Sequence, residues 1–438
     1  MRVLHVSTRL ILGGSQENTA LSCQGQAALG HEVHLAYGPI EGPEGSLADE
    51  VERYRTPDGR RILTHTVPDM VRQISPRRDA RALRQLTSLI ESLRPDVVHT
   101  HSSKAGVLGR LAAWRVLRAS GGERPAVVHT VHGPPFMPLV GGPAARARTG
   151  LTNALYTIAE RLAARRCHRI VSVADAMTAQ FLARGIGDPS LYVTVRSGMR
   201  TGDFLHPTPD QTRAQARAAL GIPPDAMVFG TVARLAEHKG HADLLDALAG
   251  ELRARRSWRL LWVGDGSLRS ALEQRIASLG IENRVIMTGL VPPSKVPGLV
   301  RAMDTLVHPS WREGLPRTIP QALLCGVPAI AYDCDGAPEV CLDVTRVGRD
   351  RATGILVPRG DTAALRRAAL WMAGHPLDRK AMGERGQVMC AAMFDDAAMV
   401  RQLEVVYRDA IRSRQSHRAR GQGSSESSHA DARRHDAQ

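Results

Sequence analysis

A short stretch in the second half of the chain places an acid, a turn and an arginine directly ahead of an apolar run. Residues 311–329 read WREGLPRTIPQALLCGVPA, with Glu313 before the turn and Arg317 at its end. The first N–H groups of a helix have no partner within the helix, so a turn that exposes them forms a small anion site. We therefore expect this stretch to hold phosphate.

A second candidate anion site lies in VARLAEHKG, where Arg234 and Lys239 are five positions apart. After a strand this pair can converge on one diphosphate, because arginine presents a planar fork and lysine a mobile point charge. The spacing alone fits two solvated basic residues equally well.

Other small or polar residues follow predicted strands. They are the Gly13-Gly14 pair, the segment HTHSSKAG, His132 in HTVHG and Gly264 in WVGDG. In open α/β sheets ligands bind at the carboxyl ends of the strands, so these positions are candidate contacts. A tight turn explains the glycine pair as well as a ligand does, and His132 fits either a substrate contact or a hydrogen-bonded core histidine.

No metal or redox-cofactor signal in the sequence is specific. Asp333 to Asp335 read DCD, a pattern that holds a metal in some sugar-transfer enzymes, but a turn leading into Gly336 explains it equally well. The six cysteines form no CxxC pair, so we expect reduced residues rather than a zinc site or disulfides. The motif GxGxxG is absent, which argues against an NAD site. We therefore expect neither a metal nor a cofactor.

These candidate residues need a scaffold, and the chain alternates strands and helices throughout. The β-branched runs MRVLHVS, HEVHLAYG, DVVHTHS, AVVHTVHG and RIVSVAD each lead into a loop and a helical stretch. A second series, MVFGTVARL, RLLWVGDG, RVIMTGL, TLVHPSW and PAIAYDCDG, begins after a turn-rich segment near residue 200. This alternation predicts an α/β fold of two Rossmann-like domains, each with a buried parallel sheet.

The charge balance narrows the classes of partner. The 438 residues include 58 Lys and Arg against 43 Asp and Glu, a formal net charge of +15 that favours anionic partners. Only 4 % of residues are aromatic and none interleave with the basic runs, so we expect no nucleic-acid partner. No run approaches the roughly 20 apolar residues of a membrane span, and the start MRVLHVSTRL is unlike a signal peptide. We expect a cytoplasmic protein.

In this order the motifs resemble those of the family-4 glycosyltransferases, retaining nucleotide-sugar enzymes of GT-B architecture. The resemblance extends to about residue 410 and rests on GHEV, RPDVVHTHSSKAGVLGRLAA, HTVHG, VARLAEHKG, WVGDG and EGLPRTIPQALLCGVPAIA. The forms HTHSSKAG and HTVHG look most like the bacterial members that build capsule, exopolysaccharide or O-antigen units. The resemblance implies two Rossmann-like domains whose parallel sheets face one another across a cleft.

The same resemblance predicts how the chain is divided. Residues 1–200 form the acceptor-side domain, and residues 201–395 bind the nucleotide sugar. Residues 396–411 form a helix that crosses back to the first domain. Residues 412–438 contain almost no large apolar side chains and are predicted to be disordered.

Each matching residue acquires an expected role from the family. Arg234 and Lys239 grip the donor diphosphate, Glu313 contacts the donor sugar, and His132 lies near the reacting carbon. The other donor-binding positions are Gly14, Gly264, Gly314, Leu315, Pro316 and Arg317.

One position departs from the family pattern. The signature has a second glutamate where this chain has Gln321, eight residues after Glu313. In the family that carboxylate accepts hydrogen bonds from both ribose hydroxyls of the nucleotide. Gln321 keeps a carbonyl acceptor without the charge, and charge-assisted hydrogen bonds are roughly twice as strong as neutral ones. We expect weaker or altered ribose recognition at a working donor site.

The expected activity is transfer of a hexosyl or N-acetylhexosaminyl unit, with retention, from a nucleotide sugar to a glycan or lipid-linked acceptor in polysaccharide biosynthesis. A UDP-sugar is the expected donor. A lipid-linked acceptor and the basic runs together predict peripheral attachment to an anionic surface at the inner membrane face. Two alternatives stay open: a sugar-nucleotide epimerase of the same architecture, and a non-catalytic nucleotide-sugar-binding relative.

Overall fold

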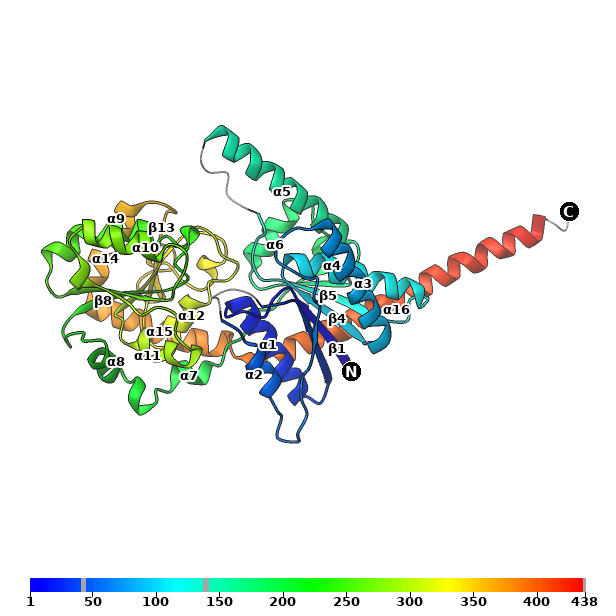
Figure 1. Cartoon of the computed structure of the whole chain (residues 1–438), viewed down its shortest axis with the longest axis horizontal. Coiled ribbons are helices and arrows are strands. Elements are labelled where there is room, and N and C mark those ends of the chain that lie inside the picture. The colour runs from blue at the N-terminus through cyan, green and yellow to red at the C-terminus, as the bar shows by residue number, and fades with distance from the viewer. Residues whose placement is uncertain (41–44, 137–141, 436–438) are drawn as a thin grey trace. The chain divides into compact units, whose positions relative to one another are not determined.

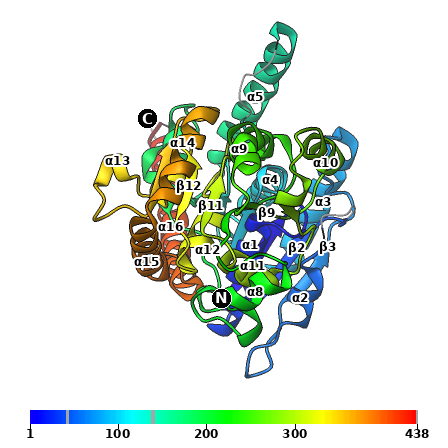
Figure 2. The same ribbon diagram turned by 90° about the vertical axis from the view of Figure 1, so that its left-hand side faces the viewer.

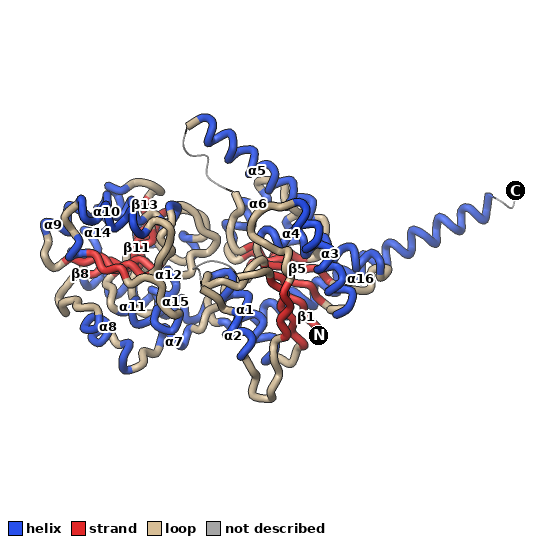
Figure 3. Tube along the Cα trace, in the orientation of Figure 1, coloured by secondary structure: helices blue, strands red, loops and turns tan. Residues whose placement is uncertain are grey.

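The computed structural model describes residues 1–40, 45–136 and 142–435 (Figure 1). The chain divides into two compact units: unit 1 contains Met1–Gly198 and Asp396–Gln438, and unit 2 contains Met199–Asp395. In each unit the strands lie together and helices flank them (Figure 3).

Unit 1 is built on a seven-stranded parallel sheet. Its strands, in spatial order, are β3 (Leu63–Thr66), β2 (Glu32–Tyr37), β1 (Arg2–Ser7), β4 (Val97–His101), β5 (Ala126–Val131), β6 (Arg169–Ser172) and β7 (Tyr192–Thr194). Every residue of β4 and β5 is buried, as expected for a parallel sheet covered on both faces. The strand order reverses between β1 and β4, and sheets of this kind bind ligands at such a reversal.

The helices of unit 1 include one from the far end of the chain. They are α1 (Gly14–Ala28), α2 (Ala48–Arg53), α3 (Pro76–Leu93), α4 (Ser103–Ala119), α5 (Pro143–Ala164), α6 (Asp175–Leu182) and α16 (Asp396–His435). The first turns of α16 bury Val400, Leu403 and Tyr407 in one core cluster with residues of β1, β4 and β5. A Cβ atom on Gly25 of α1 would lie 2.4 Å from a methyl group of Val400, so the two helices pack too closely for a larger residue at this position.

The last helix of the chain, α16, continues to His435. The disorder of residues 412–438 stays a prediction. The segment contains no proline between Asp396 and His435, although Gly421 and Gly423 lower the helix propensity of this stretch. Low apolar content predicts the lack of a core here, but it does not by itself forbid helix.

Unit 2 is built on a six-stranded parallel sheet. In spatial order its strands are β10 (Val285–Met287), β9 (Trp258–Val263), β8 (Met227–Val232), β11 (Thr305–His308), β12 (Ala329–Tyr332) and β13 (Gly354–Val357). Its helices are α7 (Thr201–Leu205), α8 (Arg213–Ala219), α9 (His241–Ala254), α10 (Arg269–Ser278), α11 (Val296–Arg301), α12 (Thr318–Leu324), α13 (Val344–Val347), α14 (Thr362–Gly374) and α15 (Pro376–Met393). The order of this sheet reverses between β8 and β11. The prediction of two α/β domains with parallel sheets is confirmed.

Among the helices that the structure describes, none combines the length and the apolar character that crossing a bilayer requires.

Candidate functional site

The Glu313 carboxylate is the centre of a polar cluster in unit 2. It lies in the loop between β11 and α12, where its Oε1 forms an ion pair with the Lys239 ammonium and lies 3.1 Å from Nε2 of His308. The backbone N–H of Glu313 donates to Oδ2 of Asp335 at 2.6 Å. Nδ1 of His308 lies 3.1 Å from the Thr318 hydroxyl, so the imidazole is itself held in place. Side chain and backbone of Glu313 are therefore both fixed.

The environment of Glu313 keeps its carboxylate ionised. Burial acts to raise the pKa of this carboxyl, but the Lys239 ammonium and the hydrogen bond from His308 outweigh burial and hold the pKa well below its usual range. The side chains of Glu313 and Lys239 are 15 % and 16 % exposed, so water screens their attraction only in part.

Two glycines let the loops around this cluster pack closely. Gly240 follows Lys239 with φ 71°, and a Cβ atom there would lie 2.0 Å from the carbonyl oxygen of Pro309. Gly264 has φ 135°, and its Cβ atom would lie 2.2 Å from the carbonyl oxygen of Ala233, next to Arg234. Any other residue is strained at these positions. The predicted donor residue Gly264 thus shapes the Arg234 loop through its backbone.

Three positively charged side chains lie in the loops near Glu313. Arg234 is exposed, and Lys239 and Arg312 are half-buried. Burial, followed by the charges of Lys239 and Arg312, lowers the pKa of His238 to about 4. Burial also lowers the pKa of Arg312, with a further contribution from the charge of Arg234. Because these cations act on the same neighbours, they form one positive region at the carboxyl ends of β8 and β11, which suits a diphosphate.

The loop from Gly314 to Arg317 leads into α12. The carbonyl of Gly314 accepts a hydrogen bond from the N–H of Gly336 at 3.1 Å, and Leu315 and Arg317 are buried. The helix after this loop begins at Thr318 and has only seven residues. Gln321 is half-buried on α12, and within the described part of the chain its side chain makes no hydrogen bond. Its amide is therefore available to a ligand.

The aspartates of the DCD stretch have separate structural partners. Asp335, with φ 50°, accepts the hydrogen bond from Glu313, and Asp333 forms an ion pair with Arg346. These contacts support a turn at this position.

Sequence reasoning missed several residues of the unit 2 cluster. The sequence does not predict Arg312, His308 or His238 as site residues. Each of them lies within five positions of a predicted site residue, Glu313 or Lys239. Arg312 directly precedes Glu313, and its charge alone was a usable signal.

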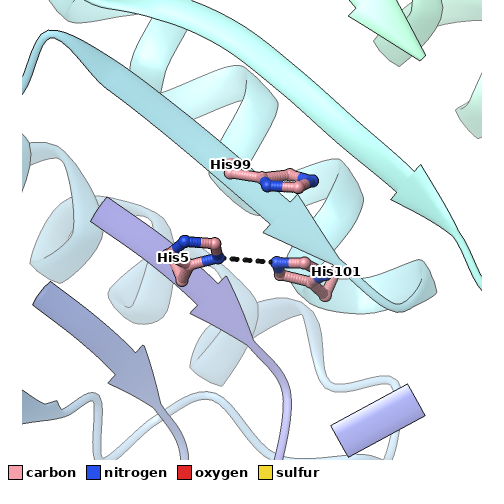
Figure 4. Close-up of side chains that lie close together, drawn as sticks. All are labelled: His5, His99 and His101. Atoms are coloured by element: carbon pink, nitrogen blue, oxygen red, sulfur yellow. Dashed lines mark hydrogen bonds between the residues drawn. The ribbon is translucent and has the colours of Figure 1, made fainter. Parts of the chain in front are cut away.

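In unit 1, His132 belongs to a row of hydrogen-bonded imidazoles. It follows β5, and its Nε2 lies 3.0 Å from Nδ1 of His101 at the end of β4. Nε2 of His101 lies 2.9 Å from Nδ1 of His5 on β1 (Figure 4). Nε2 of His5 lies 2.8 Å from Oε1 of Gln26. His132 is thus both a half-buried histidine with a core partner and a candidate ligand contact.

The row continues from Gln26 to the last helix. The Gln26 amide nitrogen donates to the Tyr407 hydroxyl at 2.8 Å, and that hydroxyl lies 2.7 Å from Nδ1 of His99. Nε2 of His99 lies 2.6 Å from the Thr130 hydroxyl. We call the set His132, His101, His5, Gln26, Tyr407, His99 and Thr130 the histidine chain.

Three members of the histidine chain have the arrangement of possible metal ligands. Nitrogen atoms of His5, His99 and His101 all lie within 4.8 Å of one another (Figure 4). However, both ring nitrogens of each of these residues already have a hydrogen-bond partner. A separation of 2.9 Å between the ring nitrogens of His5 and His101 is a hydrogen-bond distance. The geometry therefore favours a hydrogen-bond network over a metal centre.

The predicted site residues fall into two groups. Arg234, Lys239, Gly264, Glu313 and the loop through Gln321 come together in unit 2. His132 and Gly14, the first residue of α1, belong to unit 1.

We predict that stability falls as the pH drops from about 6.5 to about 4. The folded protein keeps His5, His238 and His241 neutral, since burial lowers the pKa of each to about 4. Histidine in the unfolded chain titrates near 6.5, so below that pH the unfolded state binds more protons. Thermal midpoints measured across this range should decline, and His241→Leu should flatten the decline, because both ring nitrogens of His241 are buried without a hydrogen-bond partner.

The control for this prediction is His206→Ala, which removes an exposed histidine of unit 2. The control should leave the slope unchanged. Equal slopes for all three proteins would show that the buried imidazoles do not govern acid stability.

Two family models match the chain, one in each half. The model "Glycosyltransferase Family 4" matches residues 12–194, and the model "Glycosyl transferases group 1" matches residues 226–375. The matched regions contain both groups of site residues.

Curated relatives carry transferase names. The 2-deoxystreptamine N-acetyl-D-glucosaminyltransferase of Streptomyces fradiae is 31 % identical over 296 residues, which cover 66 % of this chain and 65 % of that protein. The UDP-Gal:alpha-D-GlcNAc-diphosphoundecaprenol alpha-1,3-galactosyltransferase of Escherichia coli is 28 % identical over 273 residues, 62 % of this chain and 65 % of that protein. The chain thus matches just under two thirds of the length of these relatives.

Solved structures share the fold across almost the whole chain. HepE of Anabaena in complex with UDP has a TM-score of 0.70 at 20 % identity and covers 93 % of this chain and 99 % of that one. Sucrose-phosphate synthase of Thermosynechococcus elongatus has a TM-score of 0.74 at 19 % identity, with coverage of 93 % and 98 %. By both family models the chain belongs to the family-4 glycosyltransferases, and the solved structures show its GT-B fold, as the sequence predicts.

Proposed function

We propose that the protein transfers a sugar, with retention, from a UDP-linked donor to a lipid-linked saccharide acceptor in polysaccharide biosynthesis. The observation that carries this proposal is the cluster of Lys239, Arg234 and Arg312 around the ionised Glu313. Breaking the bond between the anomeric carbon and the diphosphate leaves a strongly anionic group. Fixed positive charge directed at developing negative charge commonly contributes a few kcal/mol to such a step.

Glu313 is suited to bind the hydroxyls of the donor sugar, and Lys239 is suited to bind the donor phosphate. An ionised carboxylate can only accept hydrogen bonds, and sugar hydroxyls supply them. The contacts from Lys239 and His308 to one oxygen hold the carboxylate still. The ammonium has three N–H donors, so Lys239 can keep its bond to Glu313 and still contact a phosphate.

The proposed reaction uses no metal and no cofactor. Arg234, Lys239 and Arg312 supply the positive charge that a metal ion supplies elsewhere. Retention is proposed from membership of a family of retaining enzymes. The acceptor hydroxyl attacks the anomeric carbon from the face that the diphosphate leaves, the bond between that carbon and the diphosphate breaks, and the hydroxyl proton passes to the departing phosphate oxygen.

Relatives support the donor and acceptor classes. HepE, which has the same fold, was solved in complex with UDP. The name of the E. coli relative contains both UDP-Gal and a diphosphoundecaprenol acceptor. A second candidate acceptor is an aminocyclitol, because the S. fradiae relative is named for 2-deoxystreptamine. Assays with each acceptor class distinguish the two acceptors. NMR of the product anomer tests the proposed retention.

The epimerase and the non-catalytic alternatives predict different results with donor alone. An epimerase converts the UDP-sugar without an acceptor, whereas the transferase leaves it nearly unchanged until an acceptor is added. A non-catalytic relative binds the UDP-sugar but converts it neither alone nor in the presence of an acceptor.

We predict that UDP raises the thermal midpoint of the wild-type protein and that Arg234→Ala or Lys239→Ala loses most of this effect. A ligand at 100 times its dissociation constant stabilises a protein by about 2.7 kcal/mol, which is a readily measured shift. The control, Lys295→Ala, removes an exposed lysine of the same unit that pairs with exposed Asp210. Full UDP stabilisation of Arg234→Ala and Lys239→Ala would refute the phosphate site. Addition of a chelator should leave the wild-type shift unchanged.

A separate prediction concerns the altered signature position. Gln321→Glu should tighten UDP binding, because a carboxylate forms charge-assisted hydrogen bonds with ribose hydroxyls. Isothermal titration with UDP measures the change, and titration with ribose-free pyrophosphate serves as the control that should not improve. Weaker UDP binding by Gln321→Glu would show that this side chain does not face the ribose.

A further inference from the structure

Helix α5 of unit 1 exposes an apolar stripe. Leu151, Leu155, Ile158 and Leu162 are 64, 60, 54 and 48 % exposed. Their spacing of four, three and four residues places them on one face, within an arc of about 60° around the helix axis. The first turns of α5 extend beyond the neighbouring helices of unit 1 in both views (Figures 1 and 2). Four large aliphatic side chains on one exposed face mark an interaction surface.

Arginines border this stripe on both sides. Arg148 and Arg165 are exposed and lie about 20° beyond its two edges in helical projection. Neither forms an ion pair with any residue that the structure describes. The one acid in α5, Glu160, is buried in an ion pair with Arg110 at 2.6 Å and contributes no negative charge to the surface. The exposed face is therefore apolar at its centre and positive at its margins.

The buried ion pair also gives the helix a rigid base. Arg110 of α4 is fully buried, and its Nε donates to the carbonyl of Gly106 at 2.8 Å. Removal of either partner would leave an uncompensated buried charge, so the contact between α4 and α5 is strongly maintained. The stripe is thus presented on a fixed helix.

We propose that this face of α5 docks on an anionic lipid surface. An apolar stripe with arginines beside it is the pattern of a helix that lies in the plane of a membrane interface. The aliphatic side chains enter the boundary of the acyl chains, while the arginine guanidinium groups stay beside the lipid phosphates. A second copy of the same helix is a poor occupant, because pairing the stripes would bring arginines against arginines. The inference deepens the proposed function by naming the surface that brings a lipid-linked acceptor to unit 1.

The test is co-sedimentation with phosphatidylcholine vesicles, with and without phosphatidylglycerol. Wild-type protein should bind the vesicles that contain phosphatidylglycerol, and the double variant L155E/I158E should bind them about tenfold or more weakly. The double variant R148E/R165E should lose the preference for phosphatidylglycerol. The matched control is L377E/V388E, which places the same charges on exposed aliphatic positions of α15 and should bind like wild type.

Three outcomes would overturn the proposal. They are no vesicle binding by wild type, equal binding by L155E/I158E, and a wild-type dimer in solution that L155E/I158E abolishes. The UDP-induced thermal shift of L155E/I158E should match that of wild type. If UDP shifts the thermal midpoint of neither wild type nor L155E/I158E, the proposed function fails. The vesicle binding of the two proteins still decides the docking proposal.

The histidine chain carries a second, independent inference. A neutral imidazole has one N–H donor and one lone-pair acceptor, so a row of neutral imidazoles must donate in a single direction. Burial lowers the pKa of His5 to about 4 and lowers those of His99 and His101 well below the usual value, which keeps all three neutral. One residue at the end of the row can therefore set the proton position in every ring.

Gln26 is the residue that sets the direction. Its amide oxygen accepts from Nε2 of His5, so Nδ1 of His5 accepts from Nε2 of His101. Nδ1 of His101 in turn accepts from Nε2 of His132. On the other side, the Gln26 amide nitrogen donates to Tyr407, whose hydroxyl then donates to His99.

The geometry points to Gln26 as a positioning residue that fixes the proton of His132 on Nε2 and makes Nδ1 the acceptor atom of that ring. This proton position does not rest on the proposed function, because it follows from the hydrogen bonds of unit 1 alone.

Nitrogen-15 NMR of histidine-labelled protein tests the proton position directly. The His132 signals are assigned by their loss in His132→Asn. Wild type and Gln26→Glu should both show the Nε2–H form of His132, because a carboxylate also accepts from His5. Gln26→Met should give a mixture of tautomers. The control is Gln24→Met, the same substitution at another buried glutamine of α1, which should leave His132 unchanged.

A wild-type His132 with its proton on Nδ1, or an unchanged tautomer in Gln26→Met, would overturn this inference. Addition of Zn²⁺ should leave the signals of His5, His99 and His101 in place. Their displacement by stoichiometric Zn²⁺ would identify a metal centre instead.

Discussion

The arrangement of unit 2 depends on how a single carboxylate is held. Lys239 reaches Glu313 from the loop after β8, His308 from the end of β11, and Asp335 from the loop after β12. These strands are neighbours in the order β8, β11, β12. The contacts therefore require the sheet reversal between β8 and β11, and they also hold one negative charge among several positive ones. Without that charge, Lys239 and its neighbouring cations would repel one another.

In unit 1 the buried polar groups are neutral imidazoles, not charged side chains. Its sheet also reverses where its polar residues gather, between β1 and β4, but the histidine chain lies deep enough that burial keeps its imidazoles uncharged. Neutral polar groups can be buried at small cost when each has a partner. Tyr407 supplies such a partner from α16, so the last helix completes the polar interior of a sheet formed by the first part of the chain.

The sequence predicted the parts of the site that follow strands and match a motif, and it missed the parts that depend on strand order. Glu313, Lys239 and Arg234 were found because each stands in a recognisable run after a strand. His5 was not, and the predicted segment HTHSSKAG, which begins at His99, was not connected with it, since 94 positions separate His5 from His99 and only the parallel register of β1 with β4 makes them neighbours. The stripe on α5 is visible as a helical pattern, but such a pattern ordinarily predicts a core-facing helix. Only the structure shows that this face is exposed.

The two inferences about unit 1 meet in one stretch of chain. His132 directly follows β5, and Pro143, the first residue of α5, is eleven positions further on. The helix that is proposed to lie on a lipid surface therefore stands close in sequence to the imidazole whose proton Gln26 is proposed to position. The Arg110–Glu160 pair anchors the far end of the same helix to α4. Because α4 follows directly from β4 and His101, one rigid connection joins the surface that would meet the lipid to the residues that set the proton on His132.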